Sequence, residues 1–163
     1  MTNMAFELAF RDRGIPFFRA DVGDRNVMRA MKERGWSLGG EGSGHILNLK
    51  KTNTGDGLII ALQILEIIDR KKKSLAQIGN TVTKYPQILK NIRCRDPESL
   101  LSNHTFCSEI RGCTGRLGEK GRILVRKSGT EPLVRVMVEG QNRKEIESIG
   151  DHLESVAVSV RQF

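Results

Sequence analysis

The sequence predicts a mixed α/β protein made of two successive parts, and three observations lead to this fold class. Apolar residues recur at helical spacing in segments such as 57–70, whereas they alternate as in strands in segments such as 133–139. A polar stretch at residues 79–84 divides the elements into two groups and is the best candidate for a domain boundary. We therefore expect an α/β domain over residues 1–80, followed by a small α+β domain with an antiparallel sheet over residues 83–163.

In the first part, the periodicity predicts helices and strands that alternate along the chain. The segment 57–70 is apolar around most of its circumference, so we expect it to be a buried central helix. Asp24 can cap a helix that ends at Gly35. The expected elements are helices over 4–13, 24–35, 57–70 and 75–78, and strands over 17–22, 36–38 and 45–49.

In the second part, the clearest signals come from one strand and the last helix. The strand places Val134, Val136 and Val138 on one face. Asn142 can act as the N-cap of the last helix, with Glu145 three residues later. The expected elements are strands over 87–94, 122–127 and 133–139, a helix around 105–111 and a helix after residue 142.

The composition excludes several classes of protein. With 38% hydrophobic residues among 163, the chain resembles an ordinary globular protein rather than a disordered or fibrous one. No stretch reaches the roughly 18 to 20 uninterrupted apolar residues of a membrane span, and residues 1–10 lack the features of a secretory signal. Three cysteines without CxxC spacing indicate neither a disulfide framework nor a zinc site. We therefore expect a cytoplasmic protein with no membrane partner.

The formal net charge of +8 suits either a nucleic acid or a phosphorylated small molecule as partner. No basic stretch is interleaved with aromatic residues, as stacking on bases would require, so we expect no nucleic-acid partner. A non-catalytic phosphate-binding or nucleic-acid-binding module remains the alternative. Titration at increasing salt separates the two, because nucleic-acid binding releases many counterions and one sugar phosphate releases few.

The strongest local signal is the segment 126–132, Arg-Lys-Ser-Gly-Thr-Glu-Pro, between two expected strands. It combines two cations, two hydroxyls and a glycine, and phosphate dianions are held by guanidinium groups, hydroxyls and backbone amides together. Gly129 permits close approach or a positive φ. Arg135 leaves the next strand on the face opposite the valines and can reach the same anion. The alternative is an exposed hairpin with solvated cations.

The second signal is the glycine-rich segment 39–45, Gly-Gly-Glu-Gly-Ser-Gly-His. Its glycines bring the backbone close, while Glu41 can accept hydrogen bonds from two vicinal sugar hydroxyls and Ser43 can donate or accept. His45 adds an imidazole to the same space. The alternative is a glycine-rich connection between strands, with Glu41 in solvent and His45 satisfied within the sheet.

Two short motifs complete the pattern. Val-Gly-Asp-Arg at 22–25 and Thr-Gly-Asp-Gly at 54–57 each place a glycine and a carboxylate at an expected helix start, where helix capping alone explains them. Taken in order with the segments 39–45 and 126–140, however, they resemble the alpha-D-phosphohexomutase superfamily. The set favours its phosphoglucosamine mutase branch, with phosphomannomutase/phosphoglucomutase as the competitor, and the resemblance covers residues 4–160.

This resemblance implies a four-domain enzyme whose phosphoserine lies in the first domain and whose Mg²⁺ loop lies in the second. The chain resembles only the third and fourth domains, which read the substrate. We therefore expect residues 1–80 to form an incomplete three-layer α/β/α domain with a mixed sheet that lacks its opening strand. The exposed sheet edge should make this domain the less stable one or cause the chain to associate.

The resemblance also implies partners and roles. The family interconverts glucosamine 6-phosphate and glucosamine 1-phosphate through a bisphosphate intermediate, so the expected partners are a phosphorylated amino sugar and the missing N-terminal domains, and an oligomer remains open. No catalytic or metal-binding residue is expected in this chain, which should be inactive alone. Gly42 replaces a residue that is more often larger in this branch, which puts fine substrate discrimination in doubt. The implied site residues are Glu41, Ser43 and His45 for the sugar, Gly23, Asp24 and Arg25 along the cleft, and Arg126, Ser128, Gly129, Thr130 and Arg135 for the phosphate that does not react.

Overall fold

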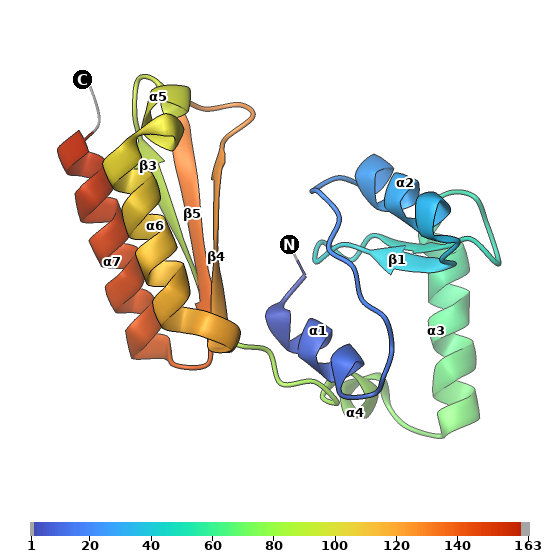
Figure 1. Cartoon of the computed structure of the whole chain (residues 1–163). Coiled ribbons are helices and arrows are strands. Elements are labelled where there is room, and N and C mark those ends of the chain that lie inside the picture. The colour runs from blue at the N-terminus through green and yellow to red at the C-terminus, as the bar shows by residue number, and fades with distance from the viewer. Residues whose placement is uncertain (1, 161–163) are drawn as a thin grey trace. The chain divides into compact units, whose positions relative to one another are not determined.

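The computed structural model describes residues 2–160, which form two compact units divided between Thr83 and Lys84 (Figure 1). We call them the N-terminal unit and the C-terminal unit, and each is described by itself. Among the described residues, none of the helices has the length and apolar content that a membrane crossing requires. The N-terminal unit contains α1 (Met4–Arg11), α2 (Asp24–Arg34), β1 (Leu38–Gly40), β2 (Ile46–Asn48), α3 (Gly57–Lys71) and α4 (Leu75–Gly79).

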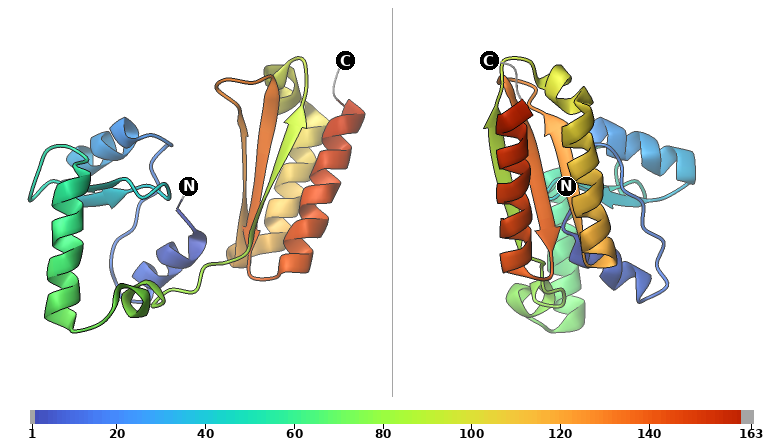
Figure 2. Two further views of the ribbon diagram at one scale, coloured as in Figure 1. Left: turned by 180° about the vertical axis from the view of Figure 1, so that it is seen from behind. Right: turned by 60° about the vertical axis from the view of Figure 1, so that its left-hand side comes forward.

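A two-stranded antiparallel sheet lies at the centre of the N-terminal unit, with Gly39 of β1 opposite Leu47 of β2. Helix α2 packs so closely on Gly39 that a Cβ atom there would overlap the side chain of Met31. Helix α3 contacts β2 on the other face, where the Asn48 amide donates to Gln63 Oε1 at 2.5 Å. The hairpin therefore separates two helix layers (Figures 1 and 2), which confirms the α/β class with a sheet of only two antiparallel strands among the described residues.

The expected strand over residues 17–22 is wrong, because this segment has no regular secondary structure and pairs with no strand. Side chains hold it instead. Phe17 stacks on Phe10 with ring centroids 5.8 Å apart, and Arg19 Nε donates to Glu7 Oε2 at 2.6 Å. A strand exists only where a neighbour supplies backbone partners, and no described segment of this unit lies beside residues 17–22 as a strand.

The expectation that α3 is a buried central helix is also wrong. None of its residues is buried. Leu58 is 71% exposed, Leu62 is 58% exposed and Leu65 is 59% exposed. These three leucines, which we call the α3 apolar face, follow one another four and three positions apart and so lie along one side of the helix. The helix begins as expected, since Asp56 accepts hydrogen bonds from the first backbone amides.

The C-terminal unit is a three-stranded antiparallel sheet with the strand order β3-β5-β4, covered by helices on one face (Figures 1 and 2). Its elements are β3 (Gln87–Arg93), α5 (Pro97–Ser102), α6 (His104–Leu117), the 3₁₀ helix η1 (Gly118–Lys120), β4 (Gly121–Lys127), β5 (Leu133–Gly140) and α7 (Arg143–Val160). The expected strands are confirmed, and the weak pattern around 105–111 belongs to the longer helix α6.

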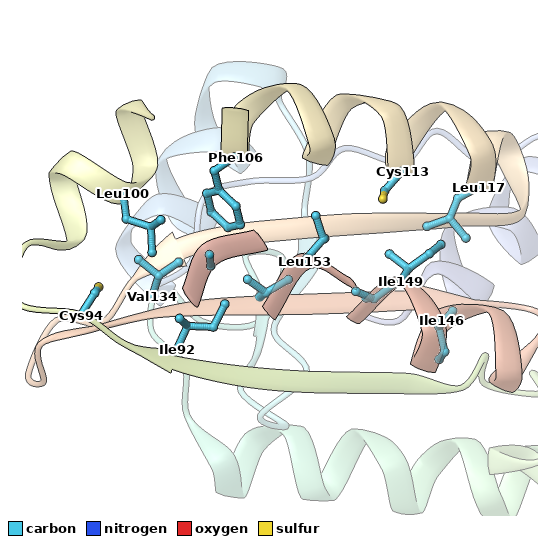
Figure 3. Packing of buried hydrophobic residues seen from close by; sticks show 13 residues of the cluster. Ile92, Cys94, Leu100, Phe106, Cys113, Leu117, Val134, Ile146, Ile149 and Leu153 are labelled. Atoms are coloured by element: carbon cyan, nitrogen blue, oxygen red, sulfur yellow. The ribbon is translucent and has the colours of Figure 1, made fainter. Parts of the chain in front are cut away.

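The core of this unit forms between β5 and the helices (Figure 3). Val134, Val136 and Val138 have no exposed surface, which confirms the face that alternation predicts. Phe106 of α6 and Leu153 of α7 are equally buried and lie above this face. Fully burying one such side chain contributes about 1.5 to 3 kcal/mol, so the sheet and its helices stabilise one another.

Ion pairs reinforce the sheet at two places. Lys90 of β3 interrupts an apolar alternation because it lies on the helix side and pairs with Asp151 at 2.7 Å and Glu154 at 2.8 Å on α7. The hydrogen bonds to these carboxylates raise the pKa of Lys90 above its ordinary value. Glu139 of β5 is fully buried, and its carboxylate accepts a hydrogen bond from Arg122 Nε at 2.7 Å. A buried carboxylate needs such a partner.

We predict that amide hydrogens exchange faster in the N-terminal unit than in the C-terminal unit. The buried apolar residues of the described N-terminal unit are Ala5, Met31 and Leu47, whereas the C-terminal unit has a continuous core. Hydrogen exchange with mass spectrometry measures this difference, and light scattering reports the mass of the exchanging species. Equal protection of both units in a monomer would contradict the prediction.

Candidate functional site

The glycine-rich segment forms the tight connection between β1 and β2. The Glu41 amide donates to the His45 carbonyl at 2.9 Å, and the Gly44 amide donates to the Glu41 carbonyl at 3.1 Å. Gly44 has a φ of 92°, in the region that side chains disfavour. Glu41 and His45 are therefore directly opposite each other across the turn, as the register of the hairpin requires.

Two side-chain contacts join this turn to the other two short motifs of the N-terminal unit. The carboxylate of Glu41 accepts a hydrogen bond from the Gly23 amide at 2.6 Å, just before α2. His45 Nε2 lies 3.2 Å from the Gly55 carbonyl oxygen, just before α3. The structure therefore brings together three motifs that are separate in the sequence.

The partner of His45 also decides where its proton lies. A carbonyl oxygen can only accept a hydrogen bond, so Nε2 must carry the proton in this contact. In the neutral ring, Nδ1 is then an acceptor. The Glu41 carboxylate is an acceptor as well, and its second oxygen forms no hydrogen bond within the described residues. The turn thus offers acceptors, which suit a ligand rich in hydroxyl or amino groups.

The remaining residues of this group form fewer contacts. Ser43 is exposed at the tip of the turn. Gly23 is the N-cap of α2 with a φ of 117°, so Asp24 lies in the first turn of the helix rather than at its cap. The Asp24 carboxylate accepts a hydrogen bond from the neighbouring amide of Arg25 at 2.7 Å, and both side chains are exposed. The cap that the sequence suggested for Asp24 is therefore wrong, because glycine already takes that position.

The basic turn of the C-terminal unit joins β4 to β5. The Ser128 amide donates to the Leu133 carbonyl at 2.9 Å, and Ser128 is 8% exposed. Arg126 of β4 lies opposite Arg135 of β5 in the register. Residues that are opposite each other share a face of the sheet, so two guanidinium groups leave the sheet on the face opposite the valines.

Arg135 has more donor capacity than its partners use. One of its terminal nitrogens lies 3.3 Å from Ser128 Oγ and 3.4 Å from Glu131 Oε2, and both distances are long for a charged donor. Its Nε is buried and has no hydrogen-bond partner among the described residues. An orphaned buried donor costs about 1 to 3 kcal/mol, which an anion bound to Arg135 would recover.

The other residues of the turn are open to solvent. Gly129 and Thr130 are exposed, and nothing lies within 4 Å of where a Cβ atom of Gly129 would stand. Gly129 does not adopt a positive φ, so of the two uses expected of this glycine only close approach by a ligand remains. Open space therefore adjoins Gly129, next to Ser128.

The sequence analysis assigned no role to two carboxylates that contact cations of this turn and of its flanking strands. Glu98, at the start of α5, forms an ion pair with Lys127 and raises the pKa of that lysine above its ordinary value. Glu131 contacts Arg135 from within the turn. Glu131 was visible in the motif as an acid between cations. Glu98 is 29 positions from Lys127, so no local pattern reveals it.

We predict that Gly55→Ala displaces the His45 ring. A Cβ atom at residue 55 would overlap the ring at Nε2, so the hydrogen bond to the Gly55 carbonyl must break. Amide chemical shifts of residues 41–45 should change in Gly55→Ala. They should change little more in the Gly55→Ala/His45→Ala double variant than in His45→Ala. Gly57→Ala is the matched control, since nothing lies within 4 Å of that position; equal changes in both glycine variants would refute the prediction.

Comparison with protein-family models covers both units. Residues 1–85 match phosphoglucomutase/phosphomannomutase, alpha/beta/alpha domain III. Residues 72–155 match phosphoglucomutase/phosphomannomutase, C-terminal domain.

Relatives and solved structures agree with these models. The chain is 48% identical over 148 residues to a phosphoglucosamine mutase of Hydrogenovibrio crunogenus, which covers 91% of the chain and 33% of the relative. It is 53% identical over 142 residues to a phosphoglucosamine mutase of Herminiimonas arsenicoxydans, and the match covers 87% of this chain and 32% of that relative. The chain thus spans about a third of the length of these relatives.

Among solved structures, the fold resembles N-acetylphosphoglucosamine mutase of Aspergillus fumigatus with a TM-score of 0.79 at 19% identity, covering 99% of this chain and 38% of that one. A phosphoglucomutase/phosphomannomutase family protein of Burkholderia thailandensis gives a TM-score of 0.66 at 20% identity, and the match covers 93% of this chain and 35% of that one. Since the first family model alone matches more than half of the residues, the chain belongs to the phosphoglucomutase/phosphomannomutase family, of which it carries domain III and the C-terminal domain.

Proposed function

We propose that this chain is the substrate-recognition part of a phosphoglucosamine mutase, an enzyme that interconverts glucosamine 6-phosphate and glucosamine 1-phosphate. The observation that carries the proposal is the Arg135 guanidinium, which has a buried donor without a partner beside Ser128. The identity of 48% to 53% with proteins of this name supports the choice of an amino-sugar phosphate over other anions.

The basic turn is the proposed site for the phosphate that does not react. Arg135 and Arg126 supply guanidinium donors from one face of the sheet, and Ser128 supplies a hydroxyl. Gly129 and Thr130 are exposed residues whose backbone amides are proposed to bind the phosphate, together with the hydroxyl of Thr130. A phosphate dianion has three acceptor oxygens, so it can engage several of these groups at once.

The turn between β1 and β2 is the proposed site for the sugar. Glu41 is oriented by the Gly23 amide and His45 by the Gly55 carbonyl, so both side chains are positioned before a ligand arrives. Ser43 lies between them in the sequence and is free to donate or accept. Gly23, Asp24 and Arg25 border the same place at the start of α2. Acceptors held in this way suit the hydroxyls and the amino group of a hexosamine.

In the proposed reaction, a phosphoserine outside this chain donates its phosphate to the sugar phosphate. The resulting bisphosphate turns around, and the other phosphate returns to the serine. The basic turn must then bind either phosphate of the bisphosphate, and the turn between β1 and β2 must bind the sugar in either orientation. Their task is to bind and position the sugar, and no residue of this chain is assigned a bond-breaking role.

The remaining parts of the enzyme are proposed to lie in the N-terminal two thirds that the relatives have in addition. Exposed leucines along the α3 apolar face support this, since further polypeptide would bury them. Mg²⁺ is proposed to be bound there as well, as the family resemblance implies. A solved N-acetylphosphoglucosamine mutase of Aspergillus fumigatus is in complex with magnesium and GlcNAc-6P. A cytoplasmic location, where disulfides are rare, is part of the proposal, and Cys94, Cys107 and Cys113 form no disulfide with one another.

We predict that glucosamine 6-phosphate binds to the basic turn of the isolated chain and that Arg135→Gln weakens this binding at least about tenfold. Hydrogen bonds to charged groups contribute about 1.5 to 3 kcal/mol each, and 1.4 kcal/mol corresponds to a factor of ten. NMR titration should shift the amides of Ser128, Gly129 and Thr130. Arg143→Gln, a change of the same charge on α7, is the matched control and should leave the affinity unchanged. If glucosamine 6-phosphate does not shift the turn amides of the wild-type chain, the proposal fails. Binding of a nucleic acid whose affinity falls steeply with salt would favour a nucleic-acid-binding module instead.

We also predict that the chain has no mutase activity alone and gains it on co-expression with the part of the Hydrogenovibrio crunogenus relative that precedes the matched region. The phosphoryl donor and the metal would come from that part. A coupled assay that consumes glucosamine 1-phosphate measures turnover, and each part alone serves as a control. Turnover by this chain alone would show that the donor lies within it.

A further inference from the structure

The basic turn contains a carboxylate, that of Glu131, beside its cations. Glu131 Oε2 lies 3.4 Å from a terminal nitrogen of Arg135, four positions further along the chain. The same nitrogen lies 3.3 Å from Ser128 Oγ, within the proposed phosphate site. Glu131 therefore occupies the donor that a phosphate would use.

The conformation of the backbone holds Glu131 at this position. The Leu133 amide donates to the Glu131 carbonyl at 2.8 Å, which closes a short turn around Pro132. Proline also restricts the residue before it to extended conformations. The glutamate is thus held at the tip of the turn with its side chain beside the guanidinium.

The contact is weak enough to be displaced. Charge-assisted hydrogen bonds between nitrogen and oxygen usually measure about 2.7 to 2.9 Å, and this one is longer. The Glu131 side chain is 53% exposed, whereas that of Arg135 is 30% exposed. The carboxylate can therefore rotate into water while the guanidinium stays in place. A dianion attracts Arg135 more strongly than a single carboxylate does.

We propose that Glu131 is an internal counter-anion that competes with phosphate for Arg135 and so makes the phosphate site easier to empty. This inference rests on the function proposed above, in which the site must release one phosphate and accept another while the bisphosphate turns around. Glu131 lowers the cost of the empty state, because Arg135 is partly compensated when phosphate leaves. It also repels the bound dianion.

The test is Glu131→Gln in the full chain, titrated with inorganic phosphate and followed by NMR at the Ser128 and Gly129 amides. Glutamine keeps the shape of the side chain and removes its charge. An exposed ion pair is typically worth about 0.2 to 1 kcal/mol, so phosphate should bind about 1.4- to fivefold more tightly and dissociate correspondingly more slowly. Glu131→Asp, which retains the charge on a shorter side chain, should give a smaller increase.

Glu147→Gln is the matched control. Glu147 pairs with Arg143 at 2.8 Å, also four positions apart, and its removal changes the net charge of the same unit by the same amount. Phosphate affinity should be unchanged in this variant. An equal gain in both variants would show a general charge effect and overturn the inference.

The remaining outcomes separate this inference from the proposed function. If the wild-type chain binds phosphate and Glu131→Gln binds it no more tightly, Glu131 is only a structural partner of Arg135 and the inference fails alone. If the wild-type turn amides do not respond to phosphate at all, the inference and the proposed function fail together.

Discussion

Side-chain alternation along β5 is the constraint on which the C-terminal unit depends. Val134, Val136 and Val138 point into the core beneath the helices, so Arg135 must leave the strand on the opposite face. A shift of register by one residue would turn the guanidinium toward the helices and move the valines to the opposite face of the sheet. The same alternation therefore stabilises the unit and positions the cation of the candidate phosphate site.

The candidate site of the N-terminal unit depends on hydrogen bonds between side chains and the backbone rather than on a large core. Glu41 is held by the Gly23 amide and His45 by the Gly55 carbonyl. Both partners are glycines at the start of helices, where the chain can approach closely. A small sheet of two strands suffices to hold these loops, although it leaves much of α3 exposed.

The two carboxylates beside the basic turn show how ligand sites can be balanced. Lys127 is paired with Glu98, and Arg135 is in weak contact with Glu131. A site with cations alone would hold a phosphate dianion firmly, and also any competing anion. Internal carboxylates reduce that attraction and offset the mutual repulsion of the cations when no ligand is bound.

Sequence patterns located most elements because their causes are local. Asn142 accepts hydrogen bonds from the amides of Lys144 and Glu145 at the start of α7, as its position predicted. The errors concern residues 17–22 and α3. A strand needs a neighbouring strand, and burial needs a covering layer, and neither requirement is visible in the segment itself. The motifs supplied the residue types of the two candidate turns, whereas the contact of Glu41 with Gly23 joins two motifs that are separate in the sequence.

By itself, the sequence determined the family, the alternation of β5 and the chemical groups of the two candidate turns, because each of these is a property of neighbouring residues. Only the tertiary structure decided that Glu41 contacts Gly23, that Glu98 pairs with Lys127 and that the donor of Arg135 remains unsatisfied. Such contacts join residues up to 29 positions apart. Their formation depends on how the chain packs, which no local pattern encodes.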